Sequence, residues 1–152
     1  MQAFRKRNAR TAALANLIIN AVIPFFILLP AAAVNVKGGA PNLLTLLLPP
    51  VFISALATTI VTFATLPGRA QRGWVPAAIL NGGGVGLLFA VPVAVLLLLI
   101  QALVPGQPVL SKPVALALSA VLGAAVGACS SLVAVRRAIS FFKLPSTITA
   151  AY

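Results

Sequence analysis

Long apolar stretches alternate with short polar segments along the whole chain. Each apolar stretch is near or above the roughly 20 residues that a helix needs to cross a bilayer, and none carries a charge at its middle. A transmembrane barrel would need alternating segments of about ten residues, and a signal peptide would be shorter than the first stretch. The pattern predicts four membrane-spanning helices, at about 11–34, 43–66, 77–104 and 114–135.

The three separators between these stretches are short, and each contains Pro and Gly, which end helices and favour turns. Connections this short make neighbouring helices antiparallel. A length of 152 residues allows one domain. We therefore expect an all-α membrane protein with a single domain over 1–152. Its four transmembrane helices would form two antiparallel hairpins, followed by a basic cytoplasmic tail at 136–152.

The basic residues are distributed unequally between the two sides of these spans. Of the eleven Lys and Arg, only Lys37 and Lys112 lie on the side away from the termini. The positive-inside rule therefore predicts that both termini face the cytoplasm. We expect the other nine to contact anionic lipid head groups or an acidic partner: Arg5, Lys6, Arg7, Arg10, Arg69, Arg72, Arg136, Arg137 and Lys143. Nucleic acid is not predicted, because no stacking aromatic residues interleave with them.

The composition excludes many kinds of site. Hydrophobic residues make up 61% of the chain, and it contains no Asp, Glu or His. Carboxylate acid–base pairs, catalytic triads and His or carboxylate metal sites are therefore impossible. The lone Cys129 cannot form a disulfide within the chain or bind zinc alone, and the adjacent Ser111 and Lys112 form no catalytic dyad. We predict no enzyme, no metal and no cofactor.

Small residues recur at helical spacing in two spans, which is typical of close helix contact in membranes. In the fourth span the repeat is Ser119, Gly123, Gly127 and Ser131, and in the third span Gly82 and Gly86 are four residues apart. We interpret both sets as helix-packing interfaces. Packing within the bundle and contact with another subunit are both open for the fourth span.

Polar side chains also recur inside the apolar stretches. Asn16 and Asn20 share one face of the first span, because residues four apart lie above one another on a helix. An amide that faces lipid is costly and normally finds a partner. We expect polar contacts between helices among Asn16, Asn20, Asn81, Ser54, Thr58, Thr62 and Thr65. They would fix the register of the bundle or line a path for a small solute.

Two passages resemble those of small bacterial four-helix membrane proteins that are often labelled permeases. One is the run Asn16-Leu17-Ile18-Ile19-Asn20, and the other leads from Pro105 through Leu110 and Ser111 to the glycines of the fourth span. The chain departs from that family in lacking acidic loop residues, and Asn16 and Asn20 are followed by Leu and Ala where an Asn-Gly pair would be expected. The resemblance implies a bacterial inner-membrane location and no catalytic residues.

From the sequence we predict a non-enzymatic integral membrane protein that acts as a structural or accessory subunit of a homo- or hetero-oligomeric complex. Its partners would be membrane lipids, above all anionic ones, together with other subunits or copies of itself. The alternative is a small channel or permease for a neutral or anionic solute, because without carboxylates the chain offers no proton or cation relay.

Overall fold

The computed structural model describes residues 2–31, 33–66 and 73–143. They form four helices, namely α1 (Gln2–Ile27), α2 (Leu43–Thr65), α3 (Trp74–Leu103) and α4 (Lys112–Phe142). Two three-residue strands, β1 (Ala33–Asn35) and β2 (Val109–Ser111), lie between them. Each helix is long and apolar enough to cross a membrane, which confirms the prediction of four helices of this kind.

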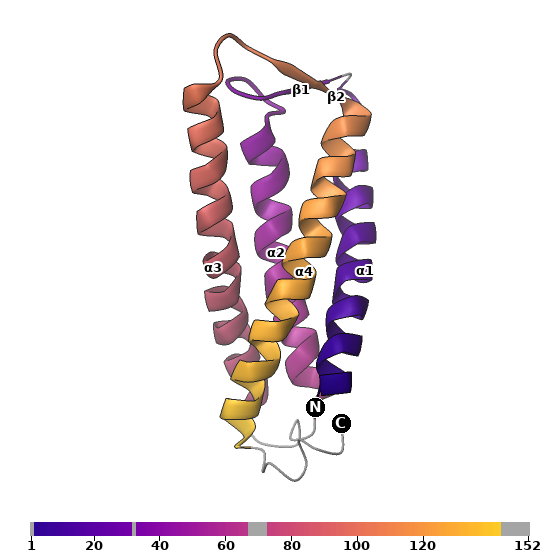
Figure 1. The fold of residues 1–152 in the computed structure, drawn as a ribbon, viewed down its shortest axis with the longest axis vertical. Coiled ribbons are helices and arrows are strands. Elements are labelled where there is room, and N and C mark those ends of the chain that lie inside the picture. The colour runs from indigo at the N-terminus through magenta and orange to yellow at the C-terminus, as the bar shows by residue number, and fades with distance from the viewer. Residues whose placement is uncertain (1, 32, 67–72, 144–152) are drawn as a thin grey trace.

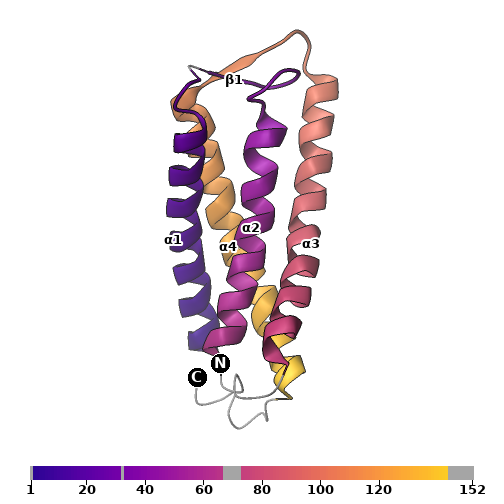
Figure 2. The same cartoon turned by 180° about the vertical axis from the view of Figure 1, so that it is seen from behind.

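The four helices lie side by side, and α1 begins where α4 ends (Figures 1 and 2). We call this end the terminal end, and the opposite end, where β1 and β2 lie, the ribbon end. Consecutive helices run in opposite directions, but α1 packs chiefly along α4, while α2 packs against both α3 and α4. The backbones of α1 and α2 approach each other at few places. The expected grouping into two hairpins is therefore not confirmed.

The helix ends differ most from prediction in α1 and α4. Helix α1 ends at Ile27, and the chain turns before Pro30, which has no N–H to continue a helix. Residues 33 and 34, placed in the first span by hydropathy, belong to β1 instead. Helix α4 continues beyond residue 135 to Phe142. It ends at Lys143, whose left-handed conformation (φ 48°) lets its N–H reach the carbonyls of Ile139 and Ser140.

The two strands form a small antiparallel ribbon that joins the α1–α2 connection to the α3–α4 connection. Val34 pairs with Leu110 at its centre, and the N–H of Val36 donates to the carbonyl of Pro108 at 3.0 Å. The Nζ of Lys37 donates to the carbonyl of Val104, at the end of α3, at 2.6 Å. Backbone and side-chain hydrogen bonds thus fasten the two connections together at the ribbon end.

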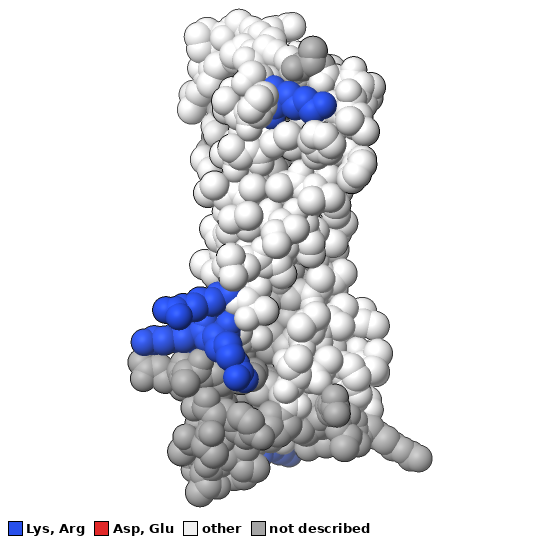
Figure 3. Space-filling view, turned by 90° about the vertical axis from the view of Figure 1, so that its right-hand side faces the viewer, with Lys and Arg blue, Asp and Glu red and all other residues white. Residues whose placement is uncertain are grey.

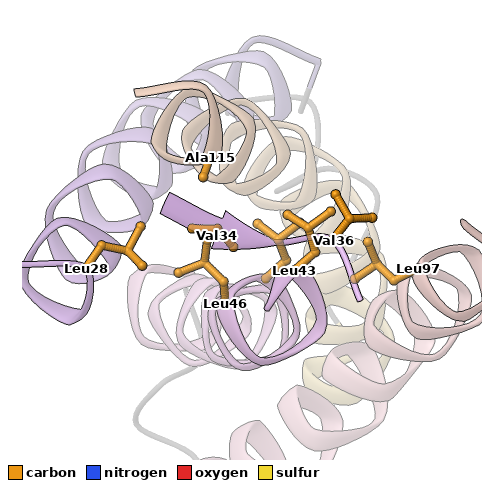
Figure 4. Close-up of a cluster of buried hydrophobic side chains, with 8 residues drawn as sticks. Leu28, Val34, Val36, Leu43, Leu46, Leu97 and Ala115 are labelled. Atoms are coloured by element: carbon orange, nitrogen blue, oxygen red, sulfur yellow. The ribbon is translucent and has the colours of Figure 1, made fainter. Parts of the chain in front are cut away.

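The ribbon covers the largest buried hydrophobic cluster, which draws side chains from α2, α3 and α4 and from the turn that follows α1 (Figure 4). Val34 is fully buried between Leu46 of α2, Leu28 after α1 and Ala115 of α4. A second cluster closes the terminal end around Phe63 of α2. The outer surface is strongly apolar, since Leu80 and Leu103 are more than three-quarters exposed. In water such a surface would be unstable, so it fits contact with lipid.

Candidate functional site

A row of hydrogen bonds between side chains crosses the gap between α1 and α2. The Nδ2 of Asn20 donates to the Oγ of Ser54 at 2.7 Å, and the Nδ2 of Asn16 donates to the Oγ1 of Thr58 at 2.9 Å. Each amide also donates to the backbone carbonyl four residues earlier in α1. Asn16, Asn20, Ser54 and Thr58 are all buried. These contacts hold two helices together although their backbones meet at few places.

Asn8 extends this row to the terminal end, and the sequence reasoning missed it. Its Nδ2 donates to the Oγ1 of Thr62 in α2 at 3.1 Å and to the Oγ of Ser131 in α4 at 2.8 Å. Asn8 lies eight residues before Asn16, on the same side of α1. This spacing could have pointed to Asn8, but Asn8 stands among basic residues outside the apolar stretch. We call the complete set the polar ladder: Asn8, Asn16, Asn20, Ser54, Thr58, Thr62 and Ser131.

The small residues of α4 make room for the polar ladder. A Cβ at Gly123 would collide with the side chain of Asn20, and a Cβ at Gly127 would collide with Asn16 and lie 2.7 Å from the carbonyl oxygen of Ala12. The small-residue face of α4 is thus covered by α1 of the same chain. Of the two alternatives open from the sequence, this structure contains the contact within the bundle, which leaves this face unavailable to another subunit.

The other three small residues of these predicted interfaces are also buried. Ser119 is buried, and its Oγ has no hydrogen-bond partner among the described residues. In α3, a Cβ at Gly82 would lie 2.7 Å from Leu56, and one at Gly86 would lie 2.7 Å from Phe52. The glycines of α3 therefore let α2 approach closely, as small residues do in membrane helices.

Asn81 and Thr65 do not join the polar ladder. Asn81 donates to the carbonyl of Ala77 within α3 at 2.9 Å and accepts a long hydrogen bond, 3.4 Å, from Nη1 of Arg137. Thr65 is exposed and donates to the carbonyl of Val61 in its own helix at 2.9 Å. Neither joins the contacts of Asn16 and Asn20: α3, which carries Asn81, lies on the far side of α2 from α1, and the hydroxyl of Thr65 bonds within its own helix. Asn81 nevertheless makes a polar contact between helices, with Arg137 of α4.

Two cavities lie beside the polar ladder, where the backbones of α1 and α2 stay apart. The cavity nearer the terminal end has a volume of about 140 Å³ and extends along α1 from Asn8 to Ile19. The cavity nearer the ribbon end has a volume of about 170 Å³ and extends from Ile19 to Ile27. Because both include Ile19, we treat them as one groove, the α1–α2 groove. A separate depression of about 380 Å³ between α2 and α3 is lined only by apolar side chains.

The terminal end is strongly basic. Helix α1 begins there with four basic residues and α4 ends there with two, followed by Lys143; Figure 3 shows the blue side chains gathered at that end of one face. Most of these side chains are exposed, and Arg5 is half-buried. Arg69 and Arg72 lie outside the described residues, as does the tail beyond residue 143. We call the described members the cationic end: Arg5, Lys6, Arg7, Arg10, Arg136, Arg137 and Lys143.

These features offer polar contacts within the bundle and positive charge at one end. The described residues contain no cluster of potential metal ligands, and Cys129 is exposed on α4. No protein family matches the chain, and no significantly similar curated protein or solved structure is found. The resemblance to small bacterial permease-like proteins therefore stays a prediction.

Proposed function

We propose that this protein is a non-enzymatic subunit of a homo- or hetero-oligomeric membrane complex, in which it has a structural or accessory role. The observation that carries the proposal is the cationic end in a chain without a single side-chain carboxylate. Seven like charges on the adjoining ends of α1 and α4 repel one another. The anions that compensate them must come from outside the chain, from lipid head groups or from acidic segments of other subunits.

The direction of insertion follows from the same charges. The cationic end would lie in the cytoplasm of a bacterial cell, with both termini, and the ribbon end would lie on the opposite side of the inner membrane. Anionic lipids of the cytoplasmic leaflet attract each nearby Lys or Arg with about 1 kcal/mol. In this orientation α1 and α2 would insert as one hairpin and α3 and α4 as another, although neither pair forms the main packing contacts of the folded bundle.

The interior of the bundle supports a structural role. The amides of the polar ladder donate to hydroxyl groups of the neighbouring helices and, for Asn16 and Asn20, also to their own helix. Groups bonded to one another in this way fix the register of helices in lipid. A solute path would instead need polar groups that stay free for the solute along the length of the bundle.

Purification from the native membrane tests this proposal. We expect the gently extracted protein to carry acidic partner chains, or further copies of itself, in native mass spectrometry. The triple substitution Arg7→Gln, Arg10→Gln and Arg136→Gln removes three exposed charges of the cationic end. It should lower the amount of retained acidic partner at least tenfold, because three contacts of about 1 kcal/mol are lost.

Lys112→Gln is the control for this experiment, because it removes a positive charge at the ribbon end. It should leave acidic partners of the cytoplasmic side in place. A monomer without any partner, in the unaltered protein, would contradict the subunit proposal.

The cavity of about 140 Å³ favours the second candidate, a small channel or permease for a neutral or anionic solute. Asn8, Asn16 and Thr58 contribute amide and hydroxyl groups to its wall. In that case liposomes containing the protein should take up a small polar solute, and Asn16→Leu should abolish uptake. Ala125→Leu, on an exposed position of α4, should leave uptake unchanged. Absence of uptake over a broad panel of solutes would rule this candidate out.

A further inference from the structure

The α1–α2 groove faces outward along one side of the bundle. Its rims carry large apolar side chains that are about half exposed, such as Ile19, Ile23 and Ile53. Six of the seven residues of the polar ladder line the groove, and the ladder's amides already donate to hydroxyl and carbonyl oxygens. An occupant therefore meets mainly apolar surface. In a bilayer the surrounding molecules at this depth are lipid chains, and filling the groove restores the dispersion contacts that a void lacks.

The dimensions of the groove fit a lipid of one leaflet. From Asn8 to Ile27 the α1 wall is about 28 Å long at 1.5 Å per residue, close to the hydrocarbon thickness of a bilayer. The part of α1 that lines the cavity nearer the terminal end runs from Asn8 to Ile19 and is about 16 Å long at the same rise per residue. That is about half of the hydrocarbon thickness, the depth that the chains of a single leaflet fill.

Arg5 lies just beyond the terminal end of this cavity. It precedes Asn8 by three residues and Ala12 by seven, so it shares the helix face on which both line the cavity. Its Nε is buried and has no hydrogen-bond partner among the described residues. A buried guanidinium nitrogen without an acceptor is unfavourable, and the planar guanidinium is suited to binding phosphate. The chain has no side-chain carboxylate that could serve instead.

We propose that the α1–α2 groove is a binding site for one anionic phospholipid. The phosphate accepts hydrogen bonds from the guanidinium of Arg5, and one acyl chain lies in the cavity between Asn8 and Ile19. The choice of the cytoplasmic leaflet rests on the orientation given under the proposed function. The site differs from general attraction to the cationic end, because it requires one side chain and one cavity.

Native mass spectrometry of the delipidated full-length protein tests this site. The probes are phosphatidylglycerol and phosphatidylcholine with identical acyl chains. We expect one phosphatidylglycerol to stay bound per chain. Phosphatidylcholine has the same phosphate but also a choline cation, which the other basic residues of the cationic end repel, so its retention should be at least tenfold weaker. Inorganic phosphate should not displace the lipid, because it has no chain to occupy the cavity.

Two matched pairs of variants separate the site from the rest of the surface. Ala15 is exposed and lines the cavity, so Ala15→Leu should fill it and lower retention at least fivefold, whereas Ala125→Leu on exposed α4 should not. Arg5→Gln should lower retention of phosphatidylglycerol at least fivefold. Lys112→Gln is the charge control, because Lys112 lies at the ribbon end, at the start of α4, and does not line the cavity.

Three results would overturn the inference. They are equal retention of the two lipids, equal effects of Ala15→Leu and Ala125→Leu, or a disulfide-linked dimer formed by Ala57→Cys in a Cys129→Ser background. The last result would place a second copy in the groove, since Ala57 lines the same cavity. Partner retention is measured in parallel on gently extracted protein. Subunits that co-purify with Ala15→Leu would keep the proposed function even where the lipid is lost. A monomer without any partner in the unaltered protein, with the lipid bound, would reject only the proposed function.

Discussion

Replacing Gly127 with alanine is expected to lower the free energy of unfolding by about 2 kcal/mol, through overpacking and loss of a hydrogen bond. The new Cβ would lie 2.7 Å from the carbonyl oxygen of Ala12 and would collide with Asn16. A backbone oxygen cannot move unless all of α1 shifts away from α4. That shift also pulls Asn16 from Thr58, its partner in α2.

The measurement is reversible unfolding of the protein in mixed micelles by sodium dodecyl sulfate, followed by the fluorescence of Trp74. Gly83→Ala is the matched control, because the same change there meets no atom within 4 Å. Because the helices persist when a membrane protein unfolds, helix propensity contributes little to the free energy of unfolding. Gly83→Ala should therefore change that free energy by no more than about 0.5 kcal/mol. Equal effects at the two glycines would show that α1 does not pack on Gly127.

Loss of the Asn20 amide is expected to destabilise the bundle by about 1–2 kcal/mol, since it removes a buried interhelical hydrogen bond. Asn20 is only 1% exposed, and its Nδ2 lies 2.7 Å from the Oγ of Ser54. In Asn20→Leu the hydroxyl of Ser54 loses its partner. A double-mutant cycle of Asn20→Leu with Ser54→Ala should give a coupling energy between about 0.6 and 1.7 kcal/mol.

Asn81→Leu serves as the control for this cycle, because Asn81 is only half-buried and its contact with Arg137 is long. It should change stability by less than about 0.5 kcal/mol, as is usual at a surface position. A coupling energy of zero between positions 20 and 54 would mean that the two side chains do not bond in the membrane.

The number of helices could be predicted from the sequence because crossing a bilayer requires a long apolar run, and hydropathy detects it directly. Which helices pack against one another could not be predicted in this way. The faces of α2 and of α3 differ little in hydrophobicity, so the apolar pattern does not indicate which neighbour each face meets. The glycines at 123 and 127 indicate close approach to some helix, but only the structure shows that it is α1.

The polar ladder could be predicted in part. The cost of an amide in lipid pointed to Asn16 and Asn20, and the spacing of Ser54 and Thr58 made them available as partners. The location of Asn81 depends on how α3 sits in the bundle, which local sequence does not determine. The ribbon strands are three residues long, too short for an alternating pattern to be recognised.

The ribbon also sets the order in which the protein can be assembled. Strand β1 is made together with the first half of the chain, but β2 follows only after α3. Strand β1 therefore has no partner until the third helix has been made. The carbonyl of Val104, which accepts the hydrogen bond from Lys37, is also absent until then. The ribbon end therefore closes late in biogenesis. Until then, α1 and α2 lack the ribbon hydrogen bonds that later join their connection to the connection between α3 and α4.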